Sequence, residues 1–374
     1  MEKGERHTDL AGVERHALEA ALEDRGHERF RARQIFQWIY RRGVTDVAAM
    51  TDLSRELRAS LAETFTVETP TILHRDTSVD GTEKFLLRLS DGRTIESVFI
   101  PDTPAMTPRH ARGHPEDGRR VTFCISTQVG CAMACAFCLT GKMGLIRNLS
   151  AGEIVGQVRV LAGALSMLDK KFNIVLMGMG EPLHNYDETM KALRILNDEY
   201  GFDMSPRRMT LSTVGILPAL ERLANEPIMP NVAISLHAPT DIQRGELVPL
   251  NRKYGVADVI EACRRFPLKR RSRITFEYVL LAGVNDRPED ARGLARLVAG
   301  IKSKVNLIPL NPAPGIPFDR PSDEAINRFA EILAERGVLV SVRKSRGRDI
   351  RAACGQLIVE GQRKSAAQQL AIMM

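Results

Sequence analysis

The sequence predicts an α/β protein whose main part is a parallel β/α unit repeated six times. Three observations support this prediction. Short apolar runs alternate with helical stretches from Val121 onward, polar and glycine-rich residues follow those runs, and the composition is globular, with 44% hydrophobic and 26% charged residues. Six units are too few to close an eight-stranded barrel, so an open partial barrel and a doubly wound sheet both fit the pattern.

The strands of the core are expected at the apolar runs VTFCIST, FNIVLMGMG, RMTLSTVG, NVAISLHAP, RITFEYVLLAG and KVNLIPLNP. Between the first two runs, Ser150 and Glu153 have the S-x-x-E spacing of a capping box, which predicts the start of a helix. Ligand sites in β/α folds lie where the carboxyl ends of the strands meet, so we expect one shared pocket there. Its candidate binding residues are Gly180, Glu181, Ser212, Ser235, Leu236, His237 and Asn311.

The remaining segments differ in character from this core. We expect an N-terminal helical accessory domain over 1–62, a β-hairpin segment and linker over 63–117, the core barrel over 118–350, and a C-terminal tail over 351–374. The linker itself is the stretch 101–120, which carries Pro, Gly and charge without periodicity.

Helix and turn signals support these boundaries. Ser54 is a candidate helix N-cap, and the pair Asp91-Gly92 separates two partly alternating apolar runs, which is typical of a hairpin. One buried helix face is expected from the spacing of Phe30, Ile35, Trp38 and Ile39.

The charge of the chain favours a polyanionic partner. The formal net charge is +7 and the sequence pI is about 9.2. Two basic clusters stand out, Lys269–Arg271 with Arg273, and Arg343-Lys344 with Arg346, Arg348 and Arg351. One such cluster alone would be read as a solvated face, but two favour contact with RNA. The N-terminus lacks a secretory signal and no run is long enough to span a membrane, so we expect a soluble, cytoplasmic protein.

Three of the six cysteines, Cys131, Cys135 and Cys138, have the spacing C-x3-C-x2-C directly after the first core strand. In a reducing compartment such cysteines are read as metal ligands before they are read as disulfides. A structural zinc site requires four closed ligands, and no further CxxC or HxxxH lies nearby. A [4Fe–4S] cluster held by three cysteines keeps one iron open for a substrate or cofactor, and we favour this alternative.

These residues resemble a known superfamily. C-x3-C-x2-C with Phe137 before its last cysteine, a GEP motif after the next strand, and strand-end Ser and Asn residues are similar to the radical S-adenosylmethionine (SAM) enzymes. The similarity narrows to the dual-specificity adenosine C2 methyltransferases of 23S rRNA and tRNA, and it runs from about residue 28 to residue 358. The blocks that carry it are RFRARQIFQWIYRRGV, VTFCISTQVGCAMACAFCLTG, GMGEPLHNYD, TLSTVG, SLHAP, NLIPLNP and RGRDIRAACGQL.

The resemblance implies a partial (βα)6 radical SAM barrel with an N-terminal helical accessory domain and a small β segment. It implies that Cys131, Cys135 and Cys138 bind one [4Fe–4S] cluster and that the strand-end residues bind SAM. It also implies 23S rRNA and tRNA as partners and a flavodoxin-like one-electron donor. We expect a monomer that does not contact a membrane.

The resemblance further assigns a catalytic cysteine pair and a base. Cys354 would accept a methyl group from one SAM, and a radical made from a second SAM would activate that methyl group for addition to adenine C2. Glu96, in ESVFIP, would remove the ring proton, and Cys124 would release the product, with a disulfide between the two cysteines. The two thiols must therefore meet, which implies that 351–358 forms a mobile loop over the carboxyl edge of the sheet. Cys263 is expected to be a packing residue.

Three other functions fit part of this pattern. A related enzyme that methylates adenine C8 and confers antibiotic resistance uses the same cysteines and cofactor. A zinc-dependent RNA-binding protein would be colourless and would need a fourth ligand. A radical SAM activase acting on a protein glycine would leave the basic clusters and Cys354 unexplained.

Overall fold

The structure is a computed structural model that describes residues 8–101 and 121–359, and its centre is a ten-stranded sheet with the order β14-β13-β12-β11-β10-β9-β6-β5-β4-β3. The strands are β3 (Thr71–Thr77), β4 (Glu83–Arg88), β5 (Thr94–Ile100), β6 (Thr122–Cys124), β9 (Asn173–Leu176), β10 (Met209–Thr213), β11 (Asn231–Ser235), β12 (Ile274–Leu280), β13 (Ser303–Pro309) and β14 (Val340–Val342). Two further strand pairs lie outside it, β1 (Thr8–Asp9) with β2 (Phe65–Thr66), and β7 (Gln128–Gly130) with β8 (Leu145–Asn148).

The strand order decides between the two architectures that the sequence allowed. From β6 to β14 every neighbour in the sheet is also the next sheet strand along the chain, and every pair is parallel. A doubly wound sheet would reverse its order at a switch point. The partial radical-SAM-type barrel is therefore confirmed, and all the predicted core strands form. The short strand β14 extends the barrel by one strand that the sequence analysis did not predict.

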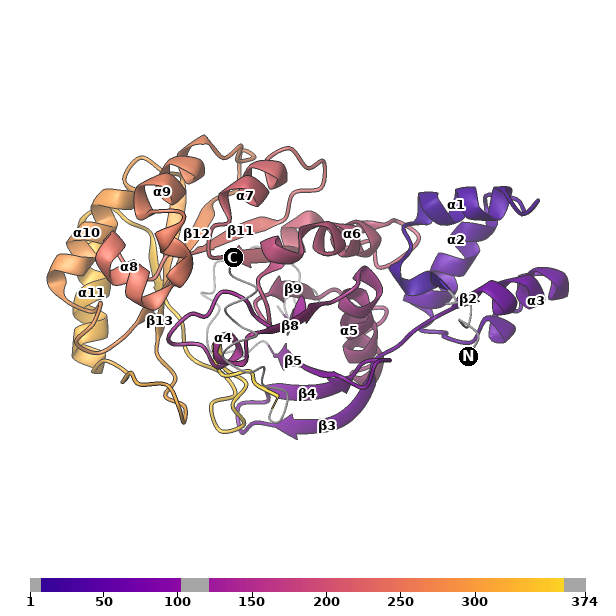
Figure 1. Ribbon diagram of the computed structural model, residues 1–374, viewed down its shortest axis with the longest axis horizontal. Helices are drawn as coiled ribbons and strands as arrows, with labels where there is room; N and C mark the ends of the chain where they lie inside the picture. The colour runs from indigo at the N-terminus through magenta and orange to yellow at the C-terminus, as the bar shows by residue number, and fades with distance from the viewer. Residues whose placement is uncertain (1–7, 102–120, 360–374) are drawn as a thin grey trace.

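Helices cover the outer side of the parallel strands (Figure 1). They are α5 (Ala151–Ala164), α6 (Tyr186–Asn197), α7 (Leu217–Leu223), α9 (Val256–Arg265), α10 (Pro288–Val298) and α11 (Asp323–Glu335). Two shorter helices, α4 (Leu139–Met143) and α8 (Asp241–Leu247), follow the loops at the carboxyl edge. Ser150 and Glu153 form the predicted capping box at the start of α5. Single turns are η1 (Leu10–Gly12), η3 (Val47–Ala49), η5 (Pro182–Asn185), η6 (Pro206–Arg208) and η7 (Pro249–Arg252).

The predicted hairpin is continuous with the barrel sheet. Strands β4 and β5 pair around Asp91-Gly92, where Gly92 has a positive φ of 82°. Strand β3 pairs antiparallel with β4, and β5 pairs antiparallel with β6. Phe99 on β5 packs against Phe123 on β6, with ring centroids 6.2 Å apart. The hairpin thus forms an antiparallel extension beside the first strand of the barrel.

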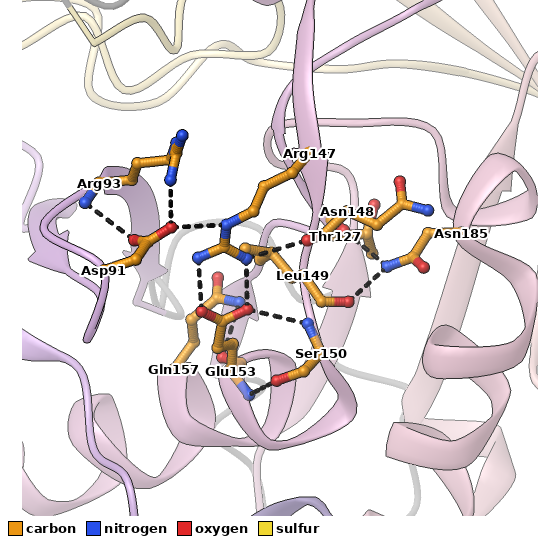
Figure 2. Close-up of polar contacts among 10 residues, drawn as sticks. All are labelled: Asp91, Arg93, Thr127, Arg147, Asn148, Leu149, Ser150, Glu153, Gln157 and Asn185. Atoms are coloured by element: carbon orange, nitrogen blue, oxygen red, sulfur yellow. Dashed lines mark hydrogen bonds and ion pairs between the residues drawn. The ribbon is translucent and has the colours of Figure 1, made fainter. Parts of the chain in front are cut away.

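Arg147, on β8, joins this hairpin to the barrel (Figure 2). Its Nε donates to Asp91 Oδ2 at 2.8 Å, and its two terminal nitrogens bind both carboxylate oxygens of Glu153 at 2.7 and 2.8 Å. Bidentate arginine–carboxylate pairs are geometrically specific, so one side chain fixes the hairpin turn, β8 and the start of α5 together. Arg147 and Arg93 keep the pKa of Asp91 below its usual range, although burial alone would raise it.

The N-terminal helices are α1 (Arg15–Glu23), α2 (Arg31–Phe36) with the π-helical turn η2 (Gln37–Arg41), and α3 (Arg55–Thr64). They form a separate group beside α5 and α6 (Figure 1). Ion pairs Arg15–Asp198 and Glu14–Arg194, each at 2.8 Å, join them to the barrel. The predicted N-cap is confirmed, because Ser54 Oγ accepts from Leu57 N.

One prediction for this region is wrong. Phe30 was expected on the buried helix face with Ile35, Trp38 and Ile39. Ile35 and Ile39 are fully buried, but Phe30 is 44% exposed and Trp38 is only partly buried. Phe30 lies before the first turn of α2, where Arg31 stacks on its ring, so it does not follow the helical spacing.

The 101–120 linker lies outside the described residues except for its first position. Among residues 8–101 and 121–359, no helix is both long and apolar enough to cross a membrane.

Candidate active site

The three cysteines of the C-x3-C-x2-C loop line one cavity at the carboxyl edge of the sheet. The loop runs between β7 and α4, and it is held by hydrogen bonds from Cys131 N to the Gly144 carbonyl at 3.1 Å and from Ala136 N to the Leu247 carbonyl at 3.0 Å. Gly130 precedes it with a φ of 79°, and a Cβ there would lie 1.9 Å from the Gly144 oxygen. A glycine is therefore required where the loop begins.

Cys131 and Cys135 are buried, Cys138 is partly buried, and all three line the same cavity. Burial raises the pKa of Cys131, Cys135 and Cys138, and the neighbouring cysteine thiols raise the pKa of Cys131 and Cys135 further. As free thiols they are neutral at neutral pH. Binding to a metal centre would release their protons, since thiolate is the ligand form of cysteine.

The donor set fits an iron–sulfur cluster better than a single ion. Among the described residues, no group of three or more His, Cys, Asp or Glu side chains is arranged to hold one metal ion. A closed zinc site needs four donors that converge on one ion. In a [4Fe–4S] cluster each cysteine binds a different iron, so three thiols around one cavity are sufficient.

The strand-end residues predicted from the sequence meet in the same cavity, with one exception. Gly180, Glu181, Ser212, Ser235, His237 and Asn311 all line it together with the three cysteines. Ser212 Oγ and Ser235 Oγ, on adjacent strands, are 3.4 Å apart. Leu236 does not line the cavity, because its side chain is fully buried in the main core. Its backbone carbonyl accepts a hydrogen bond from Arg244 at 3.1 Å.

The glycines at the end of β9 lie close to a neighbouring stretch of backbone. A Cβ on Gly178 would lie 2.7 Å from the Ile125 carbonyl. A Cβ on Gly180, where φ is 107°, would lie 2.6 Å from Gln128 Cβ. The close neighbour of both glycines is the chain that follows β6. They allow the first two barrel strands to converge below the cavity.

Glu181 is buried and anchored by backbone amides. Its carboxylate accepts from Leu183 N at 3.0 Å and from Val214 N at 2.9 Å, and it is only 3% exposed. Burial raises its pKa to about 7, against the opposing effect of these donors. The carboxylate thus connects the ends of β9 and β10 at the wall of the cavity.

His237 is a neutral hydrogen-bond acceptor. Its Nδ1 accepts from Val279 N at 3.1 Å, so its remaining proton lies on Nε2. Burial lowers its pKa to about 3, with a further contribution from the charge of Arg244. Phe137, the aromatic residue before the last cysteine, meets the His237 ring edge-on with centroids 4.7 Å apart. The cysteine loop and the end of β11 are thereby packed together.

Cys354 reaches the cavity from the C-terminal segment. Three contacts hold this segment over the carboxyl edge: Leu139 N donates to the Gly355 carbonyl at 2.8 Å, Thr140 Oγ1 to the Leu357 carbonyl at 2.6 Å, and Gln356 Nε2 to the Pro312 carbonyl at 3.0 Å. Cys354 lines both the main cavity and a smaller one beside it.

Cys124, at the end of β6, lines that smaller cavity together with Cys354, and both are free thiols. Burial, together with the nearby Cys354 thiol, raises the pKa of Cys124 to about 12. The chain therefore brings together two cysteines that lie far apart in sequence. Cys263 is buried in the core on α9, as expected of a packing residue.

Glu96 lies on β5 and lines neither of the two cavities that contain Cys354. One carboxylate oxygen pairs with Lys84 Nζ at 3.1 Å, and the other accepts from Ile358 N at 2.8 Å. Burial raises its pKa, and the charge of Lys84 opposes that effect. Glu96 thus contacts the same C-terminal segment that carries Cys354.

Three further residues at this edge were not recognised as site residues in the sequence. Arg343, assigned there to a surface cluster, is half-buried and lines both cavities. Glu277 lines the main cavity from the middle of β12. Arg244, on α8, is fully buried and does not itself line the main cavity. The sequence did contain a signal for Glu277, because it is a charged residue within an apolar strand. No pattern in the sequence marked Arg343 or Arg244.

Comparisons with known proteins agree with this geometry. A family model described as the radical SAM superfamily matches residues 125–295, and one described as the N-terminal domain of a ribosomal RNA large subunit methyltransferase matches residues 8–67. The structure is also similar to the crystal structure of a radical SAM methyltransferase from Sphaerobacter thermophilus. The TM-score is 0.84 at 48% identity, with 94% of this chain and 99% of that chain covered. The fold and the site thus define a radical SAM enzyme.

The particular family follows from the sequence relatives. The dual-specificity RNA methyltransferase RlmN of Geobacter sulfurreducens is 49% identical over 93% of this chain and 91% of its own length. That of Acidiphilium cryptum is 47% identical over 93% and 88%. The chain belongs to this family of dual-specificity RNA methyltransferases. The cofactors expected from the sequence, a [4Fe–4S] cluster and SAM, are those of radical SAM enzymes.

Proposed function

We propose that this chain methylates C2 of adenosine in 23S rRNA and in tRNA by a methyl relay through Cys354. One observation carries the proposal: Cys354 lines both the cavity of the cluster-binding cysteines and the smaller cavity that it shares with Cys124. A residue between two compartments can accept a group in one and deliver it in the other. An RNA substrate also agrees with the net charge of +7.

The chemistry explains why a carrier residue is needed. Adenine C2 lies between two ring nitrogens and is electron-poor, so it does not attack an electrophilic methyl group as a thiolate does. When bound, SAM and the cluster supply a methyl group and a one-electron cleavage that generates a carbon radical. Cys131, Cys135 and Cys138 would hold the cluster, and the strand-end serines, His237 and Asn311 would bind SAM through polar groups. Cys354 would carry the methyl group to the base.

Cys124 would complete the reaction. Once the methylene carbon is bonded to both C2 and the Cys354 sulfur, the carbon–sulfur bond must break. The Cys124 thiolate attacks the Cys354 sulfur, so that a disulfide forms while the carbon leaves with the electron pair of the broken bond and takes up a proton to become the methyl group. Because burial holds the pKa of Cys124 at about 12, its proton must be removed before this attack.

Glu96 would accept the proton that leaves C2. Burial raises its pKa above the usual value, which makes the carboxylate a better proton acceptor. Its hydrogen bond with Ile358 N occupies one oxygen, so the C-terminal segment must shift before Glu96 can reach a base. This contact would couple the position of Cys354 to the availability of the base.

The C8 methyltransferase is the second candidate, since it would use the same cysteines. The high identity to dual-specificity methyltransferases over nearly the whole chain favours C2. Mass spectrometry of adenosines from a strain that lacks the gene separates the two, because only loss of 2-methyladenosine supports the proposal. The donor of the single electron is proposed to be a flavodoxin-like protein, and the enzyme is proposed to act as a monomer.

Two single variants test the relay. Cys354→Ala has no methyl carrier, so we expect neither methylated RNA nor a protein–RNA adduct. Cys124→Ala can still form the adduct but cannot release it, so we expect a slow band on a denaturing gel. Cys263→Ala is the matched control, because it removes a buried thiol outside the site. A Cys124→Ala enzyme with normal turnover and no adduct would refute the relay.

A further inference from the structure

Arg244 is the largest fully buried side chain of the described residues, and the function proposed above gives it no role. It lies on α8, between the end of β11 and the cysteine loop. Helix α8 contacts that loop directly, since the carbonyl of Leu247 accepts from Ala136 N at 3.0 Å. Leu247 also belongs to the small apolar cluster that contains Cys131 and Cys135.

The partners of the guanidinium are neutral oxygens. It donates to the Val214 carbonyl at 2.6 Å, to Asn251 Oδ1 at 2.9 Å and to the Leu236 carbonyl at 3.1 Å. Longer contacts at 3.4 Å reach the carbonyls of Ser235 and Tyr254. In the described part of the chain, no ion pair joins Arg244 to a carboxylate.

The nearest acid is too well solvated to compensate this charge. Asp241 is reached through Asn251, whose Nδ2 donates to Asp241 Oδ1 at 3.0 Å. Asp241 is exposed, so water screens its charge. Burial lowers the pKa of Arg244 to about 10, and the residue therefore remains positive at neutral pH. A buried charge without a partner is strongly unfavourable.

The missing negative charge is available on the other side of the guanidinium. Val214, whose carbonyl accepts from Arg244 at 2.6 Å, and Leu247, on the same helix as Arg244, both belong to the small apolar cluster that contains Cys135. As a cluster ligand Cys135 is a thiolate, and the cluster gains one more negative charge when it is reduced. In a site with little water, a fixed positive charge stabilises that state.

We propose that Arg244 is a positioning residue that serves as the internal counter-charge of the iron–sulfur cluster and stabilises its one-electron-reduced state. One electron passes from a low-potential donor to the cluster, no bond breaks, and the added negative charge is balanced by the guanidinium. The same side chain fixes the carbonyls at the ends of β10 and β11, so the cavity wall and the charge are held by one residue. The proposal rests on the assignment of the three cysteines as cluster ligands.

The test is a redox titration of the loaded protein, prepared without oxygen, with dithionite as the electron source and the electron paramagnetic resonance signal of the reduced cluster as the readout. We expect Arg244→Met to shift the midpoint potential to a more negative value and to leave less cluster reduced at equal dithionite. Arg244→Lys keeps the charge and should remain close to the wild type. Arg252→Met removes an exposed arginine from the neighbouring turn η7 and should not shift the potential.

A second variant covers the case in which Arg244→Met does not fold. Asn251→Asp is nearly isosteric and places a carboxylate against the guanidinium, so it neutralises Arg244 in place and should also lower the potential. A loaded Arg244→Met or Asn251→Asp protein with the wild-type potential would overturn this proposal alone. A wild-type protein without a cluster of the [4Fe–4S] type would overturn the ligand assignment together with it.

Discussion

The two basic segments of the chain lie at opposite edges of the same sheet. Lys269–Arg271 and Arg273 come just before β12, at the edge where the parallel strands begin. Arg343 comes directly after β14, at the edge where the strands end and where the cysteines lie. Two segments that look equally basic in the sequence therefore lie in two different environments. Position before or after a parallel strand decides which basic residues can approach the reacting atoms.

The environments differ in burial as well as in charge. Lys269, Arg270 and Arg271 are exposed and border a shallow hollow with Ser205 and Asn231. At the carboxyl edge the ionisable groups are largely buried, and several have shifted pKa values. The strand ends thus form a largely buried site, while the strand starts form a solvated surface. Substitutions where the strands end should affect chemistry, and those where the strands begin should affect only association.

The largest effect is expected from the cluster ligands. Changing Cys135 to Ala removes one of three thiolates, so iron and sulfide should fall from about four of each per chain to near zero. The measurement is anaerobic iron and sulfide analysis together with the visible absorption of the protein. Cys263→Ala, in a buried thiol far from the loop in sequence, should keep both at the wild-type level. Stoichiometric zinc in protein prepared without oxygen would contradict the assignment.

Arg343 should show the next largest effect. Its guanidinium makes no hydrogen bond or ion pair within the described residues, and the nearby Cys354 raises its pKa. It is therefore available to a ligand in either cavity. We expect Arg343→Met to lower kcat by about ten- to a hundredfold, the usual range for one lost charged hydrogen bond. Lys344→Met, an exposed neighbour, should change kcat little. Equal effects of the two substitutions would mean that Arg343 acts as surface charge only.

These two predictions show what the sequence could and could not supply. The cysteine spacing and the strand-end residues could be predicted because chain direction alone places them at one edge. Arg343 was not placed at this edge because the short apolar run VLVSV, which contains β14, was not among the predicted core strands. The sequence did not show that the Leu236 side chain lies in the core, which follows from the alternation of side chains at the strand end between Ser235 and His237. Arg244 was missed because only tertiary packing reveals that an arginine is fully buried.

Glu181, at the carboxyl edge, should make the stability of the protein depend on pH. The pKa of Glu181 is about 7 in the folded protein and near 4.5 when unfolded, so the folded state binds more protons between these values. The contribution of Glu181 to stability should therefore fall as pH rises from 4.5 to 7, by on the order of 3 kcal/mol, whereas His237, with a pKa of about 3 when folded, contributes with the opposite sign. Glu181→Gln should remove only the Glu181 contribution, so the stability of the variant relative to the wild type should rise with pH, although the variant leaves one backbone amide poorly paired and is less stable overall. Urea unfolding of the cluster-free protein across this range measures it, and an unchanged slope in the variant would refute the assignment.

The smallest effect is expected at the opposite edge. Changing Lys269, Arg270 and Arg271 to Gln should weaken RNA binding for all sequences alike, because these side chains can reach phosphates but not the reacting base. Each lost phosphate contact should reduce the slope of log affinity against log salt by about 0.7 to 0.9. Since the segment lies away from the cavity, kcat at saturating RNA should stay unchanged while KM rises.

A matched variant removes the same charge elsewhere. Arg264, Arg265 and Arg328 are exposed on α9 and α11, and replacing all three by Gln lowers the net charge equally. If the strand-start cluster contacts RNA, its variant must lose more of the salt slope than this control does. Equal slopes in the two triple variants would show that Lys269–Arg271 is only solvated surface. A fall in kcat instead would mean that the two edges of the sheet are not independent, because a solvated surface far from the cysteines would then be affecting the chemical step.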